Sequence, residues 1–206
     1  MIRAKHTWLH RLFFRNYFRY ILRKDFREII LKGTFDDKGW PILLICNHIS
    51  WWDGFFPYEI NLRCFKRRFH IMMLEDQLRR IIFFRRLGAF SINPGKRSAP
   101  ESLNYAKEIL TDSRNMLVLF PQGRIHSQYT TDIKFRKGWF RIVKNSSRPV
   151  QIIFMASLTD YFSYRKPSLY VYIENYHKSE DLDFYDVEKS YNNFYLRSLE
   201  KQKMQQ

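Results

Sequence analysis

The chain has 206 residues, and its 36 Lys and Arg against 20 Asp and Glu give a formal net charge of +16. This length suits one domain with a single core. The charge favours a polyanionic partner such as nucleic acid, an anionic membrane surface or a phosphorylated substrate. Two cysteines give neither a disulfide framework nor a metal-ligand spacing, and every apolar run is far shorter than the roughly 20 residues of a membrane-spanning helix.

The first 24 residues predict one amphipathic basic helix, because two kinds of side chain recur at helical spacing on different faces. The apolar set is Trp8, Leu9, Leu12, Phe13, Tyr17, Phe18, Ile21 and Leu22, and the basic set is Arg11, Arg15, Arg19 and Arg23. Such a helix either packs on its own domain or lies in a membrane interface with its arginines towards lipid phosphates, and the two can hold together. The interrupting arginines do not fit a cleavable signal peptide. We therefore predict an N-terminal helical region at residues 1–35 and an α/β domain at residues 36–206.

After the turn-rich stretch "KGTFDDKG", short apolar runs alternate with helical patterns. The predicted strands lie at residues 40–46, 68–74, 89–93, 115–120, 148–156 and 168–175. The predicted helices lie at 53–63, 75–88 and 100–110, and a last one begins near Asp183. This alternation predicts an α/β fold, a single domain with a mixed central sheet flanked by helices. Ligand sites in such folds lie beyond the carboxyl ends of strands.

The stretch "CNHISWWD" follows the first of these strands and contains a histidine and a carboxylate, His48 and Asp53. Five positions on an ideal helix rotate about 500°, so the two side chains cannot stack on one helical face. They can meet if His48 lies in the turn and Asp53 in the first helical turn. A carboxylate on one imidazole nitrogen would leave the other nitrogen as a general base. For this spacing alone, a His–Asp pair that only caps a helix or satisfies the core is the default interpretation.

A second pattern, "VLFPQGRIHS", ends another apolar strand with Phe120, Pro121, Gln122, Gly123 and Arg124. A flexible glycine and an arginine beyond a strand end would suit recognition of an anion. Taken alone, this pattern is explained better by an ordinary turn.

Taken together, the two patterns resemble the lysophospholipid acyltransferase family, whose best-known members acylate 1-acylglycerol-3-phosphate. Asn47, His48 and Asp53 match the family's Asn-His-x4-Asp motif, and residues 120–123 match its Phe-Pro-Glu-Gly block. "FRKG" at 135–138 resembles the Phe-x-x-Gly that commonly follows, and "RPVQIIFMA" resembles a Pro-Val stretch before a late strand. The resemblance spans about residues 40 to 156.

The chain also departs from the family pattern. Gln122 stands where the family usually has Glu, and it can exchange hydrogen bonds but carries no charge. Arg124 and Ile125 replace the usual Thr-Arg, and the family's Gly-x5-Arg motif reads "GAFSINP", with Pro94 in place of the arginine.

Two nearby cations, Lys96 and Arg97, stand close enough in sequence to supply the missing charge. In the family, the arginines of the Thr-Arg and Gly-x5-Arg motifs hold the acceptor's phosphate. Their displacement therefore weakens the prediction of lysophosphatidic acid as acceptor more than that of acyl transfer itself.

The resemblance implies a direct acyl transfer in which His48 is the general base and Asp53 orients it. Residues 120–124, Lys96 and Arg97 are then the candidate substrate-binding residues. It implies acyl-CoA or an acyl-carrier protein as co-substrate, and neither a cofactor nor a metal. It also implies a lipid acceptor and a peripheral location on the cytoplasmic side of an anionic membrane. Chain-lining residues would come from "GFFPYEI" and "IIFF".

Other interpretations are weaker. A nucleic-acid-binding protein would explain the charge and the aromatic residues but not the two motifs, and the chain has no zinc-finger or RNP-like pattern. A non-catalytic lipid-binding relative would explain Gln122 and Pro94 but not the intact His48 and Asp53. A Cys46 nucleophile needs the strand to continue through His48. The remaining histidines stand singly, without ligand-like spacing.

Overall fold

The computed structural model describes residues 1–144, 146, 148–177 and 182–205. Its strands form one seven-stranded sheet in the order β1-β7-β6-β2-β5-β3-β4. The strands are β1 (Ile29–Lys32), β2 (Ile42–Cys46), β3 (Arg68–Leu74), β4 (Ala89–Ile92), β5 (Asn115–Leu119), β6 (Gln151–Asp160) and β7 (Ser168–Asn175). The α-helices are α1 (Trp8–Asp25), α2 (Phe55–Ile60), α3 (Glu75–Arg80), α4 (Ala99–Ile109) and α5 (Phe184–Lys203). Shorter 3-10 or π segments are η1 (Trp51–Gly54), η2 (Asn61–Phe65), η3 (Ile82–Leu87) and η4 (Lys137–Ile142).

The sheet is mixed, which confirms the predicted fold class. Strands β6, β2, β5, β3 and β4 are parallel, whereas β7 pairs with β6 in an antiparallel hairpin and β1 is parallel to β7. The five parallel strands therefore share one carboxyl edge, at which the loops after β2 and β5 meet.

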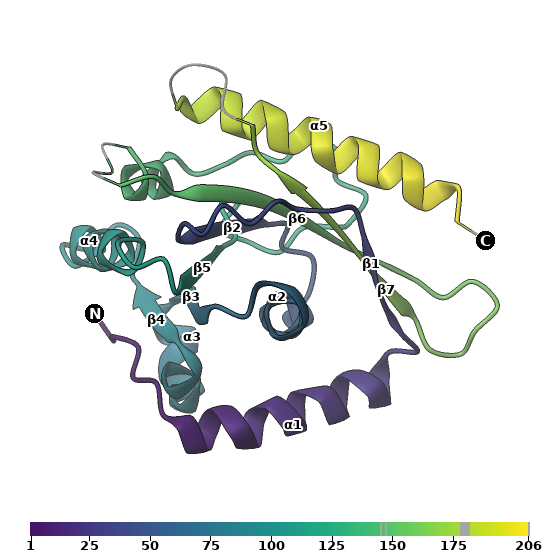
Figure 1. Ribbon diagram of the computed structural model, residues 1–206, viewed down its shortest axis with the longest axis horizontal. Helices are drawn as coiled ribbons and strands as arrows, with labels where there is room; N and C mark the ends of the chain where they lie inside the picture. The colour runs from purple at the N-terminus through teal and green to yellow at the C-terminus, as the bar shows by residue number, and fades with distance from the viewer. Residues whose placement is uncertain (145, 147, 178–181, 206) are drawn as a thin grey trace.

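Helices cover both faces of the sheet, so the central strands are apolar throughout. In β2, Leu43 and Ile45 face the core that α4 and α5 close, while Ile42 and Leu44 face the core that α1 and α2 close. Figure 1 shows α5 on one side of the sheet and α1 and α2 on the other. This two-sided burial explains why the runs at residues 40–46 and 115–120 predicted strands so clearly.

Three local predictions differ from the structure. The helix predicted at residues 53–63 is three short segments, η1, α2 and η2. Strand β1 was not expected, because it has four residues and pairs only with β7 at the edge of the sheet. The single helix predicted at residues 75–88 is two segments, α3 and η3. Ile81, with φ −127° and ψ 52°, interrupts the helix. The sequence suggested a single helix because its apolar face continues across this break.

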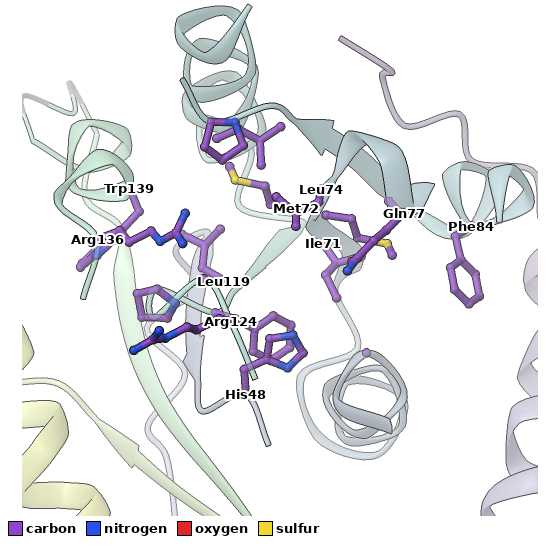
Figure 2. A pocket seen from close by; sticks show the side chains of 18 of the residues that line it. His48, Ile71, Met72, Leu74, Gln77, Phe84, Leu119, Arg124, Arg136 and Trp139 are labelled. Atoms are coloured by element: carbon purple, nitrogen blue, oxygen red, sulfur yellow. The ribbon is translucent and has the colours of Figure 1, made fainter. Parts of the chain in front are cut away.

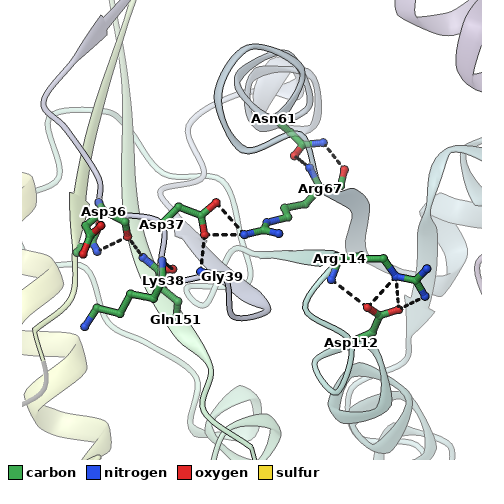
Figure 3. Close-up of polar contacts among 10 residues, drawn as sticks. Asp36, Asp37, Lys38, Gly39, Asn61, Arg67, Asp112, Arg114 and Gln151 are labelled. Carbon is green, nitrogen blue, oxygen red and sulfur yellow. Dashed lines mark hydrogen bonds and ion pairs between the residues drawn. The ribbon is translucent and has the colours of Figure 1, made fainter.

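Polar contacts close the amino ends of the strands, at the edge opposite the carboxyl ends (Figure 3). The Arg67 guanidinium is paired with Asp37 at 2.5 Å, and the Asn61 side chain bonds the backbone of Arg67. At the start of β6, Gln151 donates to the Asp36 carbonyl and accepts from the Lys38 N–H at 3.1 Å. This edge is held by structural hydrogen bonds, which leaves the carboxyl edge for a ligand site.

The N-terminal helix packs on the domain through one side only. Phe18 and Leu22 are buried against the core, and Phe14 stacks on Phe83 of η3 with ring centroids 4.8 Å apart. Trp8 is 71% exposed and Phe13 is 63% exposed. Neither α1 nor any other helix in the described part of the chain has the length and apolar character needed to cross a bilayer.

Candidate active site

The loop after β2 is fixed by Asn47, which is buried beside β6. Its side chain donates to the Ser157 carbonyl at 2.9 Å and accepts from the Ser157 N–H at 2.8 Å. These paired hydrogen bonds fix the start of the loop to the neighbouring strand. The backbone position of His48, the next residue, is therefore fixed relative to the sheet.

His48 and Asp53 are in direct contact across the turn into η1. His48 Nδ1 lies 2.6 Å from Asp53 Oδ2. Asp53 is 2% exposed and also accepts from the N–H groups of Ile49 and Ser50, at 2.5 and 2.8 Å, and from Ser50 Oγ at 2.9 Å. Asp53 therefore accepts from four donors in the described structure. With its proton on Nδ1 towards this carboxylate, His48 has the Nε2 lone pair available.

The turn after β5 packs directly on His48. The Phe120 ring stacks on the imidazole with centroids 4.6 Å apart. The His48 carbonyl accepts from Gln122 Nε2 at 3.1 Å and from the His126 N–H at 2.9 Å. Gln122 is thus a buried support of the histidine loop and not a cavity residue. A carboxylate at this position would face the same carbonyl with no proton to donate.

Gly123 is required where it stands. Its φ is +67°, and a Cβ added there would lie 2.6 Å from Arg136 Nε. Arg136 is anchored by its own N–H, which donates to the Pro121 carbonyl at 2.9 Å. The turn therefore positions a second arginine, distant in sequence, against the glycine.

A cavity of about 990 Å³ opens beside His48. Figure 2 shows Arg124 and Arg136 on one side of His48 and Gln77 and Phe84 on the other. The second side is lined largely by apolar side chains of α1, α2, β3 and η3, namely Phe18, Phe55, Tyr58, Phe69, Ile71, Met72, Met73, Phe84 and Leu87. The cavity thus has an apolar end and a cationic end, with His48 between them.

The cationic end contains Arg124, Arg136 and Arg141. No Asp or Glu is among the described residues that line the cavity. In contrast to Arg63 and Arg67, which are paired with carboxylates, these three arginines form no ion pair with any described carboxylate. Arg124 Nε donates to His126 Nε2 at 2.8 Å, a neutral partner that leaves its charge uncompensated. Guanidinium groups without an acidic partner at the mouth of a cavity suit a phosphate or another anion.

The predicted substrate-binding residues are distributed unevenly. Phe120, Pro121, Gly123 and Arg124 line the cavity, whereas Gln122 lies behind it. Lys96 and Arg97 are exposed on the turn before α4; their neighbours Pro94 and Gly95 line the cavity, but they do not.

Sequence reasoning missed three arginines of the cavity lining, namely Arg80 of α3, Arg136 and Arg141. The only signal in the sequence was the block at 135–138, where Arg136 is an unspecified position between Phe135 and Gly138.

Cys46 is buried at the end of β2 and belongs to the core that faces α1 and α2. Burial raises the pKa of its thiol well above the usual value, and the nearby Asp53 charge adds to this. A thiolate is therefore disfavoured at this position, and the thiol is absent from the cavity lining. Nowhere in the described residues do three or more His, Cys, Asp or Glu side chains gather as a metal site would require.

The fold and the site define an α/β protein with a carboxylate-oriented histidine at the carboxyl edge of its sheet. A sequence model of the acyltransferase family matches residues 27–156, which include both motifs. The chain belongs to this family, the 1-acylglycerol-3-phosphate acyltransferase type, and the resemblance predicted from the sequence is confirmed. No curated protein matches the chain.

Proposed function

We propose that this acyltransferase moves a fatty acyl chain from an acyl thioester to a hydroxyl of a lysophospholipid or a related lipid. The observation that carries the proposal is the position of His48. Its ring is oriented by Asp53 and lies between an apolar and a cationic end of one cavity. An amphiphile with a phosphate near its hydroxyl matches such a cavity in both parts.

His48 acts as the general base in this mechanism. Its Nε2 removes the proton from the acceptor hydroxyl, and Asp53 stabilises the imidazolium that forms. The hydroxyl oxygen forms a bond to the thioester carbonyl carbon, and the carbon–sulfur bond then breaks. The departing thiolate takes the proton from His48 and leaves as free thiol. The acyl group passes directly to the acceptor, so no residue is acylated.

The tetrahedral intermediate requires a donor for its oxyanion. The Gly123 N–H is not available, because it donates to the Phe120 carbonyl at 2.9 Å. The Arg136 guanidinium, which lies against Gly123, is our candidate donor. Arg124 and Arg141 would then hold the phosphate of the acceptor or of the donor.

The outer face of α1 supports association with a membrane surface. Its exposed large side chains include Trp8, Leu9, Leu12, Phe13, Tyr17 and Tyr20. Arg23 and Lys24 lie in the last turn of the same helix. Aromatic and aliphatic groups beside cations suit the interface of an anionic bilayer. We propose a peripheral location on the cytoplasmic side, with acyl-CoA or an acyl-carrier protein as donor and no further cofactor.

The test is thiol release from long-chain acyl-CoA by the purified protein, measured with a panel of lysolipids and other alcohols. His48→Ala is compared with His177→Ala, because His177 is exposed and does not line the cavity. The proposal requires release that depends on an acceptor and is lost only in His48→Ala. If no acceptor stimulates release from either acyl-CoA or an acyl-carrier protein, a lipid-binding protein without catalysis takes its place.

A further inference from the structure

The hairpin between β6 and β7 ends in an exposed aromatic and basic tip, residues 161–167. Tyr161 is 58% exposed, Phe162 45% and Tyr164 49%. Arg165 and Lys166 follow them and are exposed as well. The tip has no acidic residue, and none of its residues lines the cavity, so catalysis does not account for its composition.

The tip is a closed turn in which the Phe162 ring meets the Tyr170 ring edge to face, with centroids 6.2 Å apart. Phe162 adopts φ +44°, a left-handed conformation that is uncommon for a bulky residue. The Tyr164 N–H donates to the Tyr161 carbonyl at 2.9 Å and closes the turn. Glycine or asparagine would adopt the same backbone with less strain. The turn itself therefore does not require an aromatic ring at this position.

The tip lies against the carboxyl end of α1, although about 140 residues separate them in sequence. The Arg27 guanidinium lies 3.4 Å from the centroid of the Tyr164 ring, and the Arg27 N–H donates to the Pro167 carbonyl at 2.9 Å. Lys166 Nζ donates to the Arg23 carbonyl at 3.4 Å. Figure 1 shows the hairpin loop beyond the ends of β6 and β7, near the carboxyl end of α1. The tip thus adjoins the carboxyl end of α1.

The charge of the tip and of the adjoining end of α1 is complementary to an anionic bilayer. Of the nearby acids, Glu28 is paired with Arg27 at 3.0 Å and Asp160 accepts from Gln202 at 2.6 Å. Asp25 at the end of α1 is exposed, beside the basic Arg23 and Lys24. Tyr and Phe rings on a protruding turn, next to Arg and Lys, match the apolar and phosphate layers of a lipid interface. An acidic protein partner would need the cations but would gain less from rings displayed on a convex tip.

We propose that the β6–β7 hairpin tip is a second membrane contact, which docks on anionic phospholipid together with the outer face of α1. The inference rests on the proposed membrane association and adds a separate element to it. Two contacts at a distance along the surface fix the orientation of the protein on the bilayer. Contact through α1 alone would leave the protein free to rotate about the axis of that helix.

Insertion of the tip can be measured with an environment-sensitive fluorophore. The label is placed on Tyr161→Cys or, as the control, on Tyr185→Cys at the start of α5, both in a Cys64→Ser background. Cys46 is buried and stays unlabelled. We expect a blue shift at position 161, and none at 185, when vesicles of phosphatidylcholine and phosphatidylglycerol in equal amounts are added. Equal shifts at both positions, or no shift at 161, overturn the proposal.

The contribution to binding is tested by vesicle co-sedimentation of the full-length chain. Tyr161→Ser combined with Phe162→Asn and Lys166→Gln should weaken binding to these vesicles by roughly tenfold or more. Tyr185→Ser combined with Lys189→Gln, also on α5, should change it less than twofold. Asparagine suits the left-handed position, so the triple variant should keep the fold, which circular dichroism verifies.

The two assays are independent of catalysis, so they separate this inference from the proposed function. Acyl transfer to an acceptor dispersed in detergent should be unchanged in the triple variant if the hairpin serves docking alone. If vesicle binding is unchanged while the KM for an acyl-carrier protein rises, the tip binds the carrier protein and the membrane assignment is wrong.

Discussion

Two histidines with buried ring nitrogens, the partly exposed His6 and the buried His70, should make the stability of this protein depend steeply on pH. Their rings pack edge to face with centroids 4.7 Å apart, and none of their nitrogens has a hydrogen-bond partner that meets normal geometry in the described structure. Burial is the largest cause that lowers the pKa of each, to about 3 for His6 and about 4 for His70, from 6.5. The Arg68 charge lowers both further, whereas the Asn115 side chain opposes the effect at His70.

The sign follows from the protons that each state binds. Between about pH 4 and pH 6.5 both histidines are protonated in the unfolded chain and neutral in the folded one. Stability therefore falls as the pH falls through this window. Each histidine contributes a slope of about 1.4 kcal/mol per pH unit, and the two together about 2.7. Lowering the pH by about two units from 6.5 should remove roughly 5 kcal/mol, a large part of the 5–15 kcal/mol typical of a folded domain.

Denaturant unfolding at a series of pH values measures this slope. His70→Leu should reduce it by about half, whereas His177→Leu should leave it unchanged, because His177 is exposed. The difference between each variant and the parent removes the contribution of the carboxylates. An unchanged slope in His70→Leu would show that His70 is already solvated or protonated in the folded protein and would refute the reasoning.

Three further predictions concern the site. Asp53→Asn presents an amide where four donors converge, so kcat should fall by about 10³- to 10⁴-fold in the thiol-release assay, and the pH–rate profile should shift if His48 loses its orientation. Gly123→Ala forces a Cβ against Arg136 at a positive φ, which should cost about 1–3 kcal/mol of stability in denaturant unfolding. Arg124→Gln should lower kcat/KM for a phosphorylated acceptor by at least about tenfold and should affect a neutral monoacylglycerol less, in the same thiol-release assay; equal effects on both acceptors would show that Arg124 does not hold the acceptor's phosphate.

The sequence predicted the central sheet well, because the middle strands are apolar on both faces and carry a continuous signal. It also predicted where His48 and Asp53 would have to lie in order to meet, and the two side chains are in contact at 2.6 Å. Their catalytic role stays a prediction. The edge strand β1 and the break at Ile81 were missed, because a short edge element and an interrupted apolar face carry no clear period.

The cationic end of the cavity could be predicted only in part. Arg124 follows the strand end directly and was identified. Arg136 and Arg141 reach the same place through the packing of a segment that lacks regular hydrophobic spacing, and the chain has many other arginines. Lys96 and Arg97 were chosen by proximity in sequence, but they are exposed outside the cavity lining. Sequence distance cannot distinguish these cases, because convergence of cations depends on tertiary packing.

Because Asn47 is hydrogen-bonded to β6, that strand fixes the distance between the His48 loop and the hairpin tip. Ser157, which Asn47 holds by two hydrogen bonds, stands four residues before Tyr161 at the hairpin tip. At about 3.3 Å per residue, some 13 Å of stiff strand separates the two points. If the tip rests in the headgroup layer, the strand sets the height of the His48 loop above the bilayer. The distance that an acceptor hydroxyl must rise to be acylated would then be a fixed dimension of the protein.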